Sequence, residues 1–99
     1  MVRVSIRNYG GVAKLVGSDK KRQTRNLAEA IGALITDLRK KRGWSQAELA
    51  HRARCNESTI RILEMATKSP TLRTLEDVAA ALSMDVVVLI ITAKRRVKT

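Results

Sequence analysis

Apolar side chains recur at steps of three and four residues through the central part of the chain, which is the spacing of one face of an α-helix. The stripe from Leu27 to Leu38 predicts a first helix. Asn26 can cap its start, with Glu29 three residues later. Gly43 follows a basic last turn and is the expected left-handed residue after the helix, so the pattern indicates one amphipathic helix that ends just before it.

Three more helices are predicted by capping residues that precede apolar residues at helical spacing. The caps are Ser45, Asn56 and Thr71, and Ser45 again has a glutamate, Glu48, three positions later. The predicted helices run from 46 to 53, from 57 to about 65 and from 72 to about 82. The second and third of the four are short and are separated by only a tight turn.

The two ends of the chain follow a different pattern. Val2, Val4 and Ile6 alternate with polar residues, which predicts a short strand. Residues 17–25 are polar and basic and are expected to form an arm. Near the other end, the apolar and mostly β-branched run Val86–Ile91 is too short for a clear helical pattern and predicts a second strand.

Charge is distributed unevenly along the 99 residues, which carry 20 Lys and Arg against nine Asp and Glu, a net charge of +11. Residues 1–25 carry +6, residues 26–92 carry +1 and residues 93–99 carry +4. Basic flanks around a nearly neutral centre indicate a polyanionic partner, most often nucleic acid. Simple solubility of the flanks is the alternative.

The composition argues against several classes of function. The single Cys rules out a disulfide framework or a cysteine-built zinc finger, and His51 with Cys55 supplies only two metal ligands. With one His, the chain shows no nucleophile, base and acid set, so we expect no enzyme, no metal and no cofactor. No apolar run spans a membrane and no secretory signal is visible, which indicates a cytoplasmic protein.

Two short helices joined by a tight turn form the arrangement that presents one helix to DNA, because the major groove, about 12 Å wide, admits a single α-helix. The segments SQAELA at 45–50 and STIRILE at 58–64 resemble the Cro/lambda-repressor-like helix-turn-helix family, also called the XRE family. The resemblance covers about 27–82. It implies a mainly α fold of four to five helices and a regulator that binds double-stranded DNA.

The resemblance also implies roles for individual residues. The exposed face of the third helix reads bases, which points to Asn56, Glu57, Ser58, Arg61 and Ile62. Backbone phosphates are held by Gln46 at the start of the second helix and, after the third helix, by Lys68, Ser69 and Arg73. Arg39 and Glu64 occupy the positions of a structural ion pair.

The chemistry of the reading positions agrees in part with these roles. Arg61 can donate to guanine N7 and O6, and Ile62 can meet a thymine methyl. Glu57 can accept from cytosine N4, but it is repelled by phosphates, and an acid at a helix N-terminus is an equally good explanation of it.

Arg54 departs from the family pattern, since the family favours Gly at this position of the turn. A side chain in the left-handed conformation costs about 1–2 kcal/mol, so the turn is either strained or remodelled. Arg54 can also contact phosphate. It can favour the thiolate of the adjacent Cys55, although an ordinary turn residue is the preferred interpretation of this cysteine. The basic residues of the arm, Lys20, Lys21 and Arg22, are expected to follow the DNA backbone or a minor groove.

A dimer is expected because helix-turn-helix proteins usually bind two half-sites. The predicted strand at 85–91 suggests an intermolecular β-sheet formed by Val86, Val88 and Ile90, which the Val2–Ile6 strand can extend. A strand at this place resembles antitoxins of the HigA and HipB kind. The chain thus divides into a basic strand and arm (1–25), a DNA-binding domain (26–83) and a dimerisation strand with a basic tail (84–99).

The leading hypothesis is a dimeric, sequence-specific repressor in the cytoplasm, associated with the nucleoid. The closest alternative is an antitoxin that neutralises a toxin protein and represses its own operon. A third class is a nonspecific nucleoid protein or a basic binder of membrane surfaces. Binding that ignores DNA sequence would favour this third class.

Overall fold

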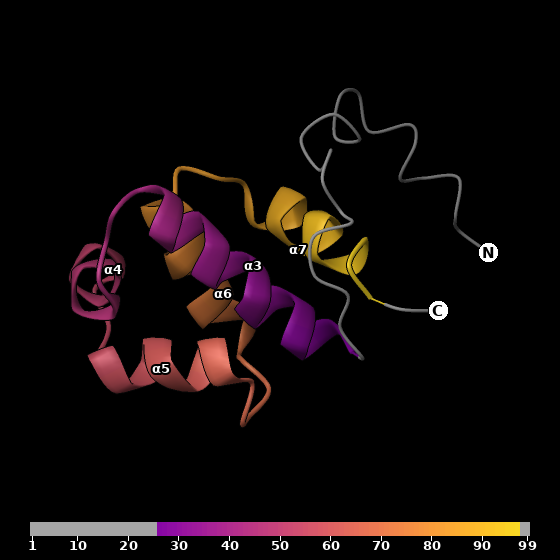
Figure 1. Ribbon diagram of the computed structural model, residues 1–99, viewed down its shortest axis with the longest axis horizontal. Coiled ribbons are helices and arrows are strands. Elements are labelled where there is room, and N and C mark those ends of the chain that lie inside the picture. The colour runs from indigo at the N-terminus through magenta and orange to yellow at the C-terminus, as the bar shows by residue number, and fades with distance from the viewer. Residues whose placement is uncertain (1–25, 98–99) are drawn as a thin grey trace.

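The computed structural model of the protein describes residues 26–97, which form five helices and no strand (Figure 1). The helices are α3 (Leu27–Lys41), α4 (Gln46–Ala53), α5 (Glu57–Met65), α6 (Leu72–Ala81) and α7 (Val86–Lys94). The mainly α fold is therefore confirmed. The predicted strand at 2–6 and the basic arm at 17–25 lie outside the described residues.

The first four helices begin where their capping residues predict. The side chains of Asn26, Ser45 and Thr71 each accept a hydrogen bond from the backbone N–H three residues later, at 2.9, 3.0 and 3.1 Å. Each bond satisfies one of the unpaired N–H groups of a helix start. Asn56 stands at the N-cap of α5 with extended backbone angles, but its side chain makes no capping bond.

One hydrophobic core joins all five helices. Its largest fully buried side chains are Ile35, Leu49, Ile60, Val78, Leu82 and Leu89. Burial of each such aliphatic side chain contributes roughly 1.5–3 kcal/mol. Helix α3 crosses the middle of the molecule and contacts both α5 and α7, while α4 packs on α5 and α6 (Figure 1).

The predicted strand at 86–91 is wrong, because this run forms the helix α7. The carboxylate of Asp85 caps it by accepting from the Val87 backbone N–H at 2.7 Å. Leu89 and Ala93, one helical turn apart, are both completely buried in the shared core. The packing surface offered by α3 and α6 thus overrides the preference of β-branched residues for strands.

The β-sheet dimer predicted from this run is wrong for the same reason. The backbone groups of Val86, Val88 and Ile90 lie within α7 and are not arranged for pairing with a second chain. Val86 and Ile90 pack against the hydrophobic core, and Val88 is partly buried.

Two arginine side chains join α3 to the helices that follow the helix-turn-helix pair. Arg96, only 6% exposed, donates to the Asp37 carboxylate at 2.8 Å and ties the segment after α7 to α3. Arg42, just after α3, donates to the carbonyl of Leu82 at 2.8 Å. Arg96 is the buried one of the two, and a buried guanidinium keeps its charge at acceptable cost only when an oxygen such as that of Asp37 faces it.

Candidate nucleic-acid interface

The turn between α4 and α5 keeps the left-handed geometry despite its arginine. Arg54 has φ 59° and ψ 45°. Its backbone N–H donates to the His51 carbonyl at 3.2 Å, and the N–H of Cys55 donates to the Ala50 carbonyl at 2.9 Å. The turn is therefore strained rather than remodelled, at a cost of about 1–2 kcal/mol, and it sets the angle between α4 and α5.

Gly32 fixes how closely α5 approaches α3. A Cβ atom at this glycine would lie 2.6 Å from the Leu63 carbonyl oxygen and 2.8 Å from that of Glu64, both backbone atoms of α5. Only a glycine permits this contact. Sequence reasoning missed it, because a glycine inside a helix usually signals only a loss of about 1 kcal/mol.

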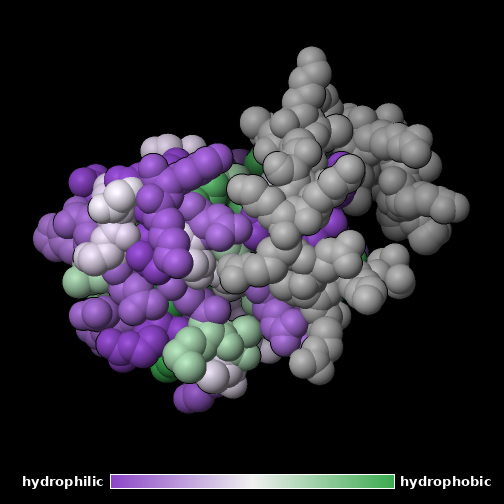
Figure 2. Space-filling model, viewed as in Figure 1, coloured by the Kyte–Doolittle hydropathy of each residue, from purple (hydrophilic) through white to green (hydrophobic). Residues whose placement is uncertain are grey.

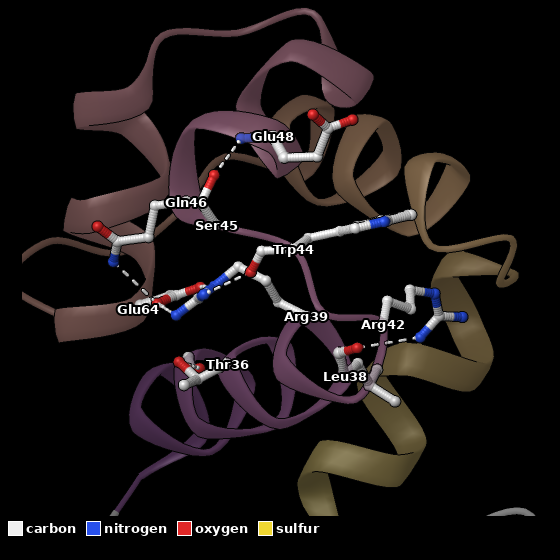
Figure 3. Close-up of polar contacts among 10 residues, drawn as sticks. Thr36, Leu38, Arg39, Arg42, Trp44, Ser45, Gln46, Glu48 and Glu64 are labelled. Carbon is white, nitrogen blue, oxygen red and sulfur yellow. Dashed lines mark hydrogen bonds and ion pairs between the residues drawn. The ribbon is translucent and has the colours of Figure 1, made fainter.

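A polar network anchors the C-terminal half of α5 to α3 and α4 (Figure 3). Arg39 donates to both carboxylate oxygens of Glu64, from Nε at 2.6 Å and from Nη2 at 3.0 Å, and to the Trp44 carbonyl from Nη1 at 2.9 Å. Gln46 Nε2 donates to Glu64 Oε1 at 3.0 Å. The structure thus brings Arg39, Glu64 and Gln46 together in one cluster.

The ionised form of Glu64 is favoured by this cluster. Burial alone raises the pKa of the carboxyl, but the hydrogen bonds from Arg39 and Gln46 together with the Arg39 charge outweigh it and hold the pKa below its ordinary value. In return, the hydrogen bond to Glu64 raises the pKa of Arg39. The Glu64 charge is therefore neutralised within the protein.

Helix α5 turns a polar face outward, away from its buried residues Ile60 and Leu63. All five residues predicted to read bases lie along it: Asn56, Glu57, Ser58 and Arg61 are exposed and Ile62 is partly buried. Arg61 Nη2 lies 3.7 Å from Glu57 Oε2. Met65, one turn beyond Arg61, is 64% exposed and was not predicted as part of this face.

The residues predicted to hold phosphates surround this face. Lys68 and Ser69 are exposed in the loop after α5, and Arg73 is exposed in the first turn of α6, 3.8 Å from Asp77. Arg54 is exposed at the other end of α5. Lys20, Lys21 and Arg22 lie outside the described residues.

A shallow groove of about 160 Å³ separates the exposed face of α5 from the start of α6. It is lined by Thr59, Ile62, Leu63, Lys68, Ser69, Pro70, Thr71 and Thr74. Figure 2 shows a hydrophobic area over the C-terminal end of α5, within a largely hydrophilic surface. Exposed Met65 and Leu72 flank the same region.

Three further features of the described residues concern the Cys55 thiol, clusters of metal ligands and helices that could cross a membrane. Burial, followed by the charge of Asp77, raises the pKa of the Cys55 thiol, which disfavours a thiolate at this position. Between residues 26 and 97 no three His, Cys, Asp or Glu side chains gather as metal ligands. Within the same range, none of the helices has the length and apolar character needed to cross a bilayer.

Two short helices joined by a strained turn, with the second exposing a polar face, define a helix-turn-helix protein of the kind that binds DNA. A family model described as a helix-turn-helix domain matches residues 30–89, more than half of the chain. The chain therefore belongs to the helix-turn-helix domain family. Searches of curated proteins and of solved structures returned no match.

Proposed function

We propose that this protein is a sequence-specific regulator of the Cro/lambda-repressor-like class, which binds double-stranded DNA and represses transcription by covering a promoter. The observation that carries this proposal is the outward polar face of α5, held in a fixed orientation by the Arg39–Glu64–Gln46 cluster. A rigidly held helix can select a sequence, because every base contact is then made at one register.

The dimensions of α5 suit the major groove. Nine residues at about 1.5 Å per residue give a helix of roughly 13 Å, which spans about four base pairs. Side chains on its exposed face then reach base edges, while the protein on either side of the helix meets the two phosphate backbones.

Gln46 is suited to one of those backbones. Its side-chain amide has two N–H donors, and one is used on Glu64. The second is available for a phosphate oxygen. Because Arg39 neutralises Glu64, this donor is presented to the DNA without a bare carboxylate beside it.

The loop after α5 is suited to the opposite backbone. Lys68 and Ser69 are exposed there, and Arg73 follows on the first turn of α6. Cations and hydroxyl groups of this kind bind phosphate without regard to sequence. The proposal thus assigns orientation to the flanking residues and specificity to α5.

The homodimer stays a prediction, which now rests on the two-half-site arrangement alone. The antitoxin alternative has lost its supporting observation, since the segment that resembled such proteins is a helix. Sedimentation of the purified chain, alone and with its DNA, measures the dimer. Co-purification of a small second protein would support the antitoxin hypothesis.

Selection of bound duplexes from random DNA tests the proposed function. We expect one enriched sequence, present as two half-sites about one DNA turn (~34 Å) apart, bound at least 1,000-fold more tightly than scrambled DNA.

Arg61→Ala should weaken binding to this sequence more than to scrambled DNA. The matched control is Arg52→Ala, because Arg52 lies over the Trp44 ring instead of on the α5 face. Equal affinity for all duplexes would contradict sequence-specific regulation and favour a nonspecific nucleoid protein.

A further inference from the structure

The exposed face of α5 carries two opposite charges one helical turn apart, on Glu57 and Arg61. Their closest atoms, Oε2 and Nη2, are 3.7 Å apart, and each side chain is 50% exposed. Exposed pairs of this kind add little to stability. Glu57 also lies in the first turn of α5, where the helix dipole favours an acid, but the dipole does not account for the arginine one turn later on the same exposed face.

A carboxylate on this surface is unfavourable for DNA binding unless it receives a hydrogen bond from the DNA. Phosphates repel it, and its neighbour Arg61, the sole cation within α5, is then partly neutralised. The two side chains together carry no net charge. Their contribution lies in the pattern of donors and acceptors that they present.

This pattern matches one base pair. A carboxylate only accepts and a guanidinium only donates. Across the major groove, a C·G base pair presents the cytosine N4 donor, then the guanine O6 and N7 acceptors side by side. An A·T pair places its N6 donor between two acceptors, so a carboxylate bonded to N6 would face acceptors on both sides.

The spacing of the two charged atoms agrees with this match. Cytosine N4 and guanine O6 are joined by a Watson–Crick hydrogen bond and are about 2.9 Å apart. The 3.7 Å between Glu57 Oε2 and Arg61 Nη2 is similar. The carboxylate can therefore reach N4 while the guanidinium reaches O6 and N7, with only small movements of half-exposed side chains.

We propose that Glu57 and Arg61 act as one unit that reads a single C·G base pair, with Glu57 accepting from cytosine N4 and Arg61 donating to guanine O6 and N7. This inference rests on the proposed function, since it requires α5 to lie in the major groove. Ile62, on the neighbouring row of α5, then faces the adjacent base pair.

The test uses the full chain and the duplex obtained by selection. N4-methylcytosine places a methyl group where the outward N4 hydrogen would lie, and 7-deazaguanine lacks N7. Each replacement at the C·G position should lower the affinity of the unchanged protein on the order of tenfold. Glu57→Ala should lose sensitivity to N4-methylcytosine but keep sensitivity to 7-deazaguanine. Arg61→Ala should lose sensitivity to 7-deazaguanine.

The matched control is Glu48→Ala. It removes the carboxylate of a second glutamate–arginine pair four residues apart in sequence, in which Glu48 lies 2.6 Å from Arg52 on α4. It should respond to both modified bases as the unchanged protein does. The unfolding midpoint, followed by the fluorescence of Trp44, establishes that each variant is folded.

The outcomes distinguish a failure of the proposed function from a failure of the proposed Glu57–Arg61 unit. If no sequence is enriched, the proposed function fails. If a sequence is enriched but Glu57→Ala still responds to N4-methylcytosine, the reading unit is overturned while the proposed function stands. An enriched sequence without a C·G pair in each half-site would also overturn it.

Discussion

Helices α5 and α7 have the same length, nine residues, and both pack against α3, yet they are held by different means. Helix α5 buries one narrow face, approaches α3 through Gly32 and is anchored by a charged cluster. Helix α7 is apolar on almost every side and is held along its length by buried Leu89 and Ala93, while a buried ion pair with α3, Arg96–Asp37, lies just after its end. The difference teaches that a charged cluster can fix the orientation of a helix that keeps a polar face exposed, whereas apolar burial supplies most of the attachment of a helix that completes the core.

The largest expected effect is the loss of the charged anchor of α5. Glu64→Ala leaves Arg39, which is 9% exposed, without its carboxylate, and a buried pair broken in this way costs about 3–5 kcal/mol. Chemical unfolding followed by Trp44 fluorescence measures the loss. As a control, Glu57→Ala removes an exposed carboxylate from the same helix and should change stability by less than about 0.5 kcal/mol. Equal losses in the two variants would contradict the anchoring role.

The same anchor makes a prediction for pH. The pKa of Glu64 is lower in the folded protein than in the unfolded chain, so its contribution is complete above its ordinary value of about 4.3 and is lost as the pH falls through the lower folded value. Unfolding free energies of the unchanged protein and of Glu64→Gln, measured between pH 7 and pH 2, should therefore converge in acid. Parallel curves over this range would show that the carboxylate is not stabilised by folding.

The next effect tests how α7 is packed. Leu89→Ala should cost about 2–5 kcal/mol, because this side chain is completely buried. Val87→Ala, at a side chain 51% exposed, should cost less than about 0.5 kcal/mol. In a strand, residues two apart share one face, so similar losses at both positions would contradict the helix. Urea unfolding of the two variants makes the comparison.

The same contrast explains how much of the fold could be predicted from the sequence. Helix α5 alternates apolar and polar residues at helical spacing, which indicates both its type and its outward face. Helix α7 has no such alternation, because neighbouring elements surround much of it, and its β-branched residues favoured a strand. Its one clear signal was Asp85, a capping residue followed by Leu89 and Ala93 at four-residue spacing.

The sequence could indicate which residues belong to the candidate interface, but it could not indicate how closely the helices approach one another. The exposed positions of α5 and the pair Arg39 and Glu64 were found from spacing and resemblance. The close contact at Gly32 and the bond from Gln46 to Glu64 depend on the angle between helices, which no sequence pattern specifies. They are therefore visible only in three dimensions.

A smaller effect concerns the backbone contact of α5 with α3. Gly32→Ala places a methyl group against two carbonyl oxygens, and we expect a loss of about 1–3 kcal/mol as the helices move apart. Because α5 shifts, affinity for the selected DNA should fall further than the small loss of folded protein explains. The control is Ala28→Gly, one turn earlier on α3, which should lower stability by about 1 kcal/mol through helix propensity alone. It shows how DNA affinity responds to a loss of stability of this size. Unchanged DNA affinity in Gly32→Ala would contradict the role of this contact in orienting α5.

The smallest effect separates strain from DNA contact at the two ends of α5. Arg54 and Ala66 have almost the same left-handed backbone, with φ of 59° and 57°. Replacing either by Gly removes strain but adds entropy to the unfolded chain, so each should stabilise the protein by about 0.5–1 kcal/mol. Arg54→Gly alone should weaken DNA binding and reduce the slope of log affinity against log salt by about 1, since only it removes a cation near the backbone. Equal slopes in the two glycine variants would exclude a phosphate contact by Arg54 and leave the turn residue with a purely conformational role.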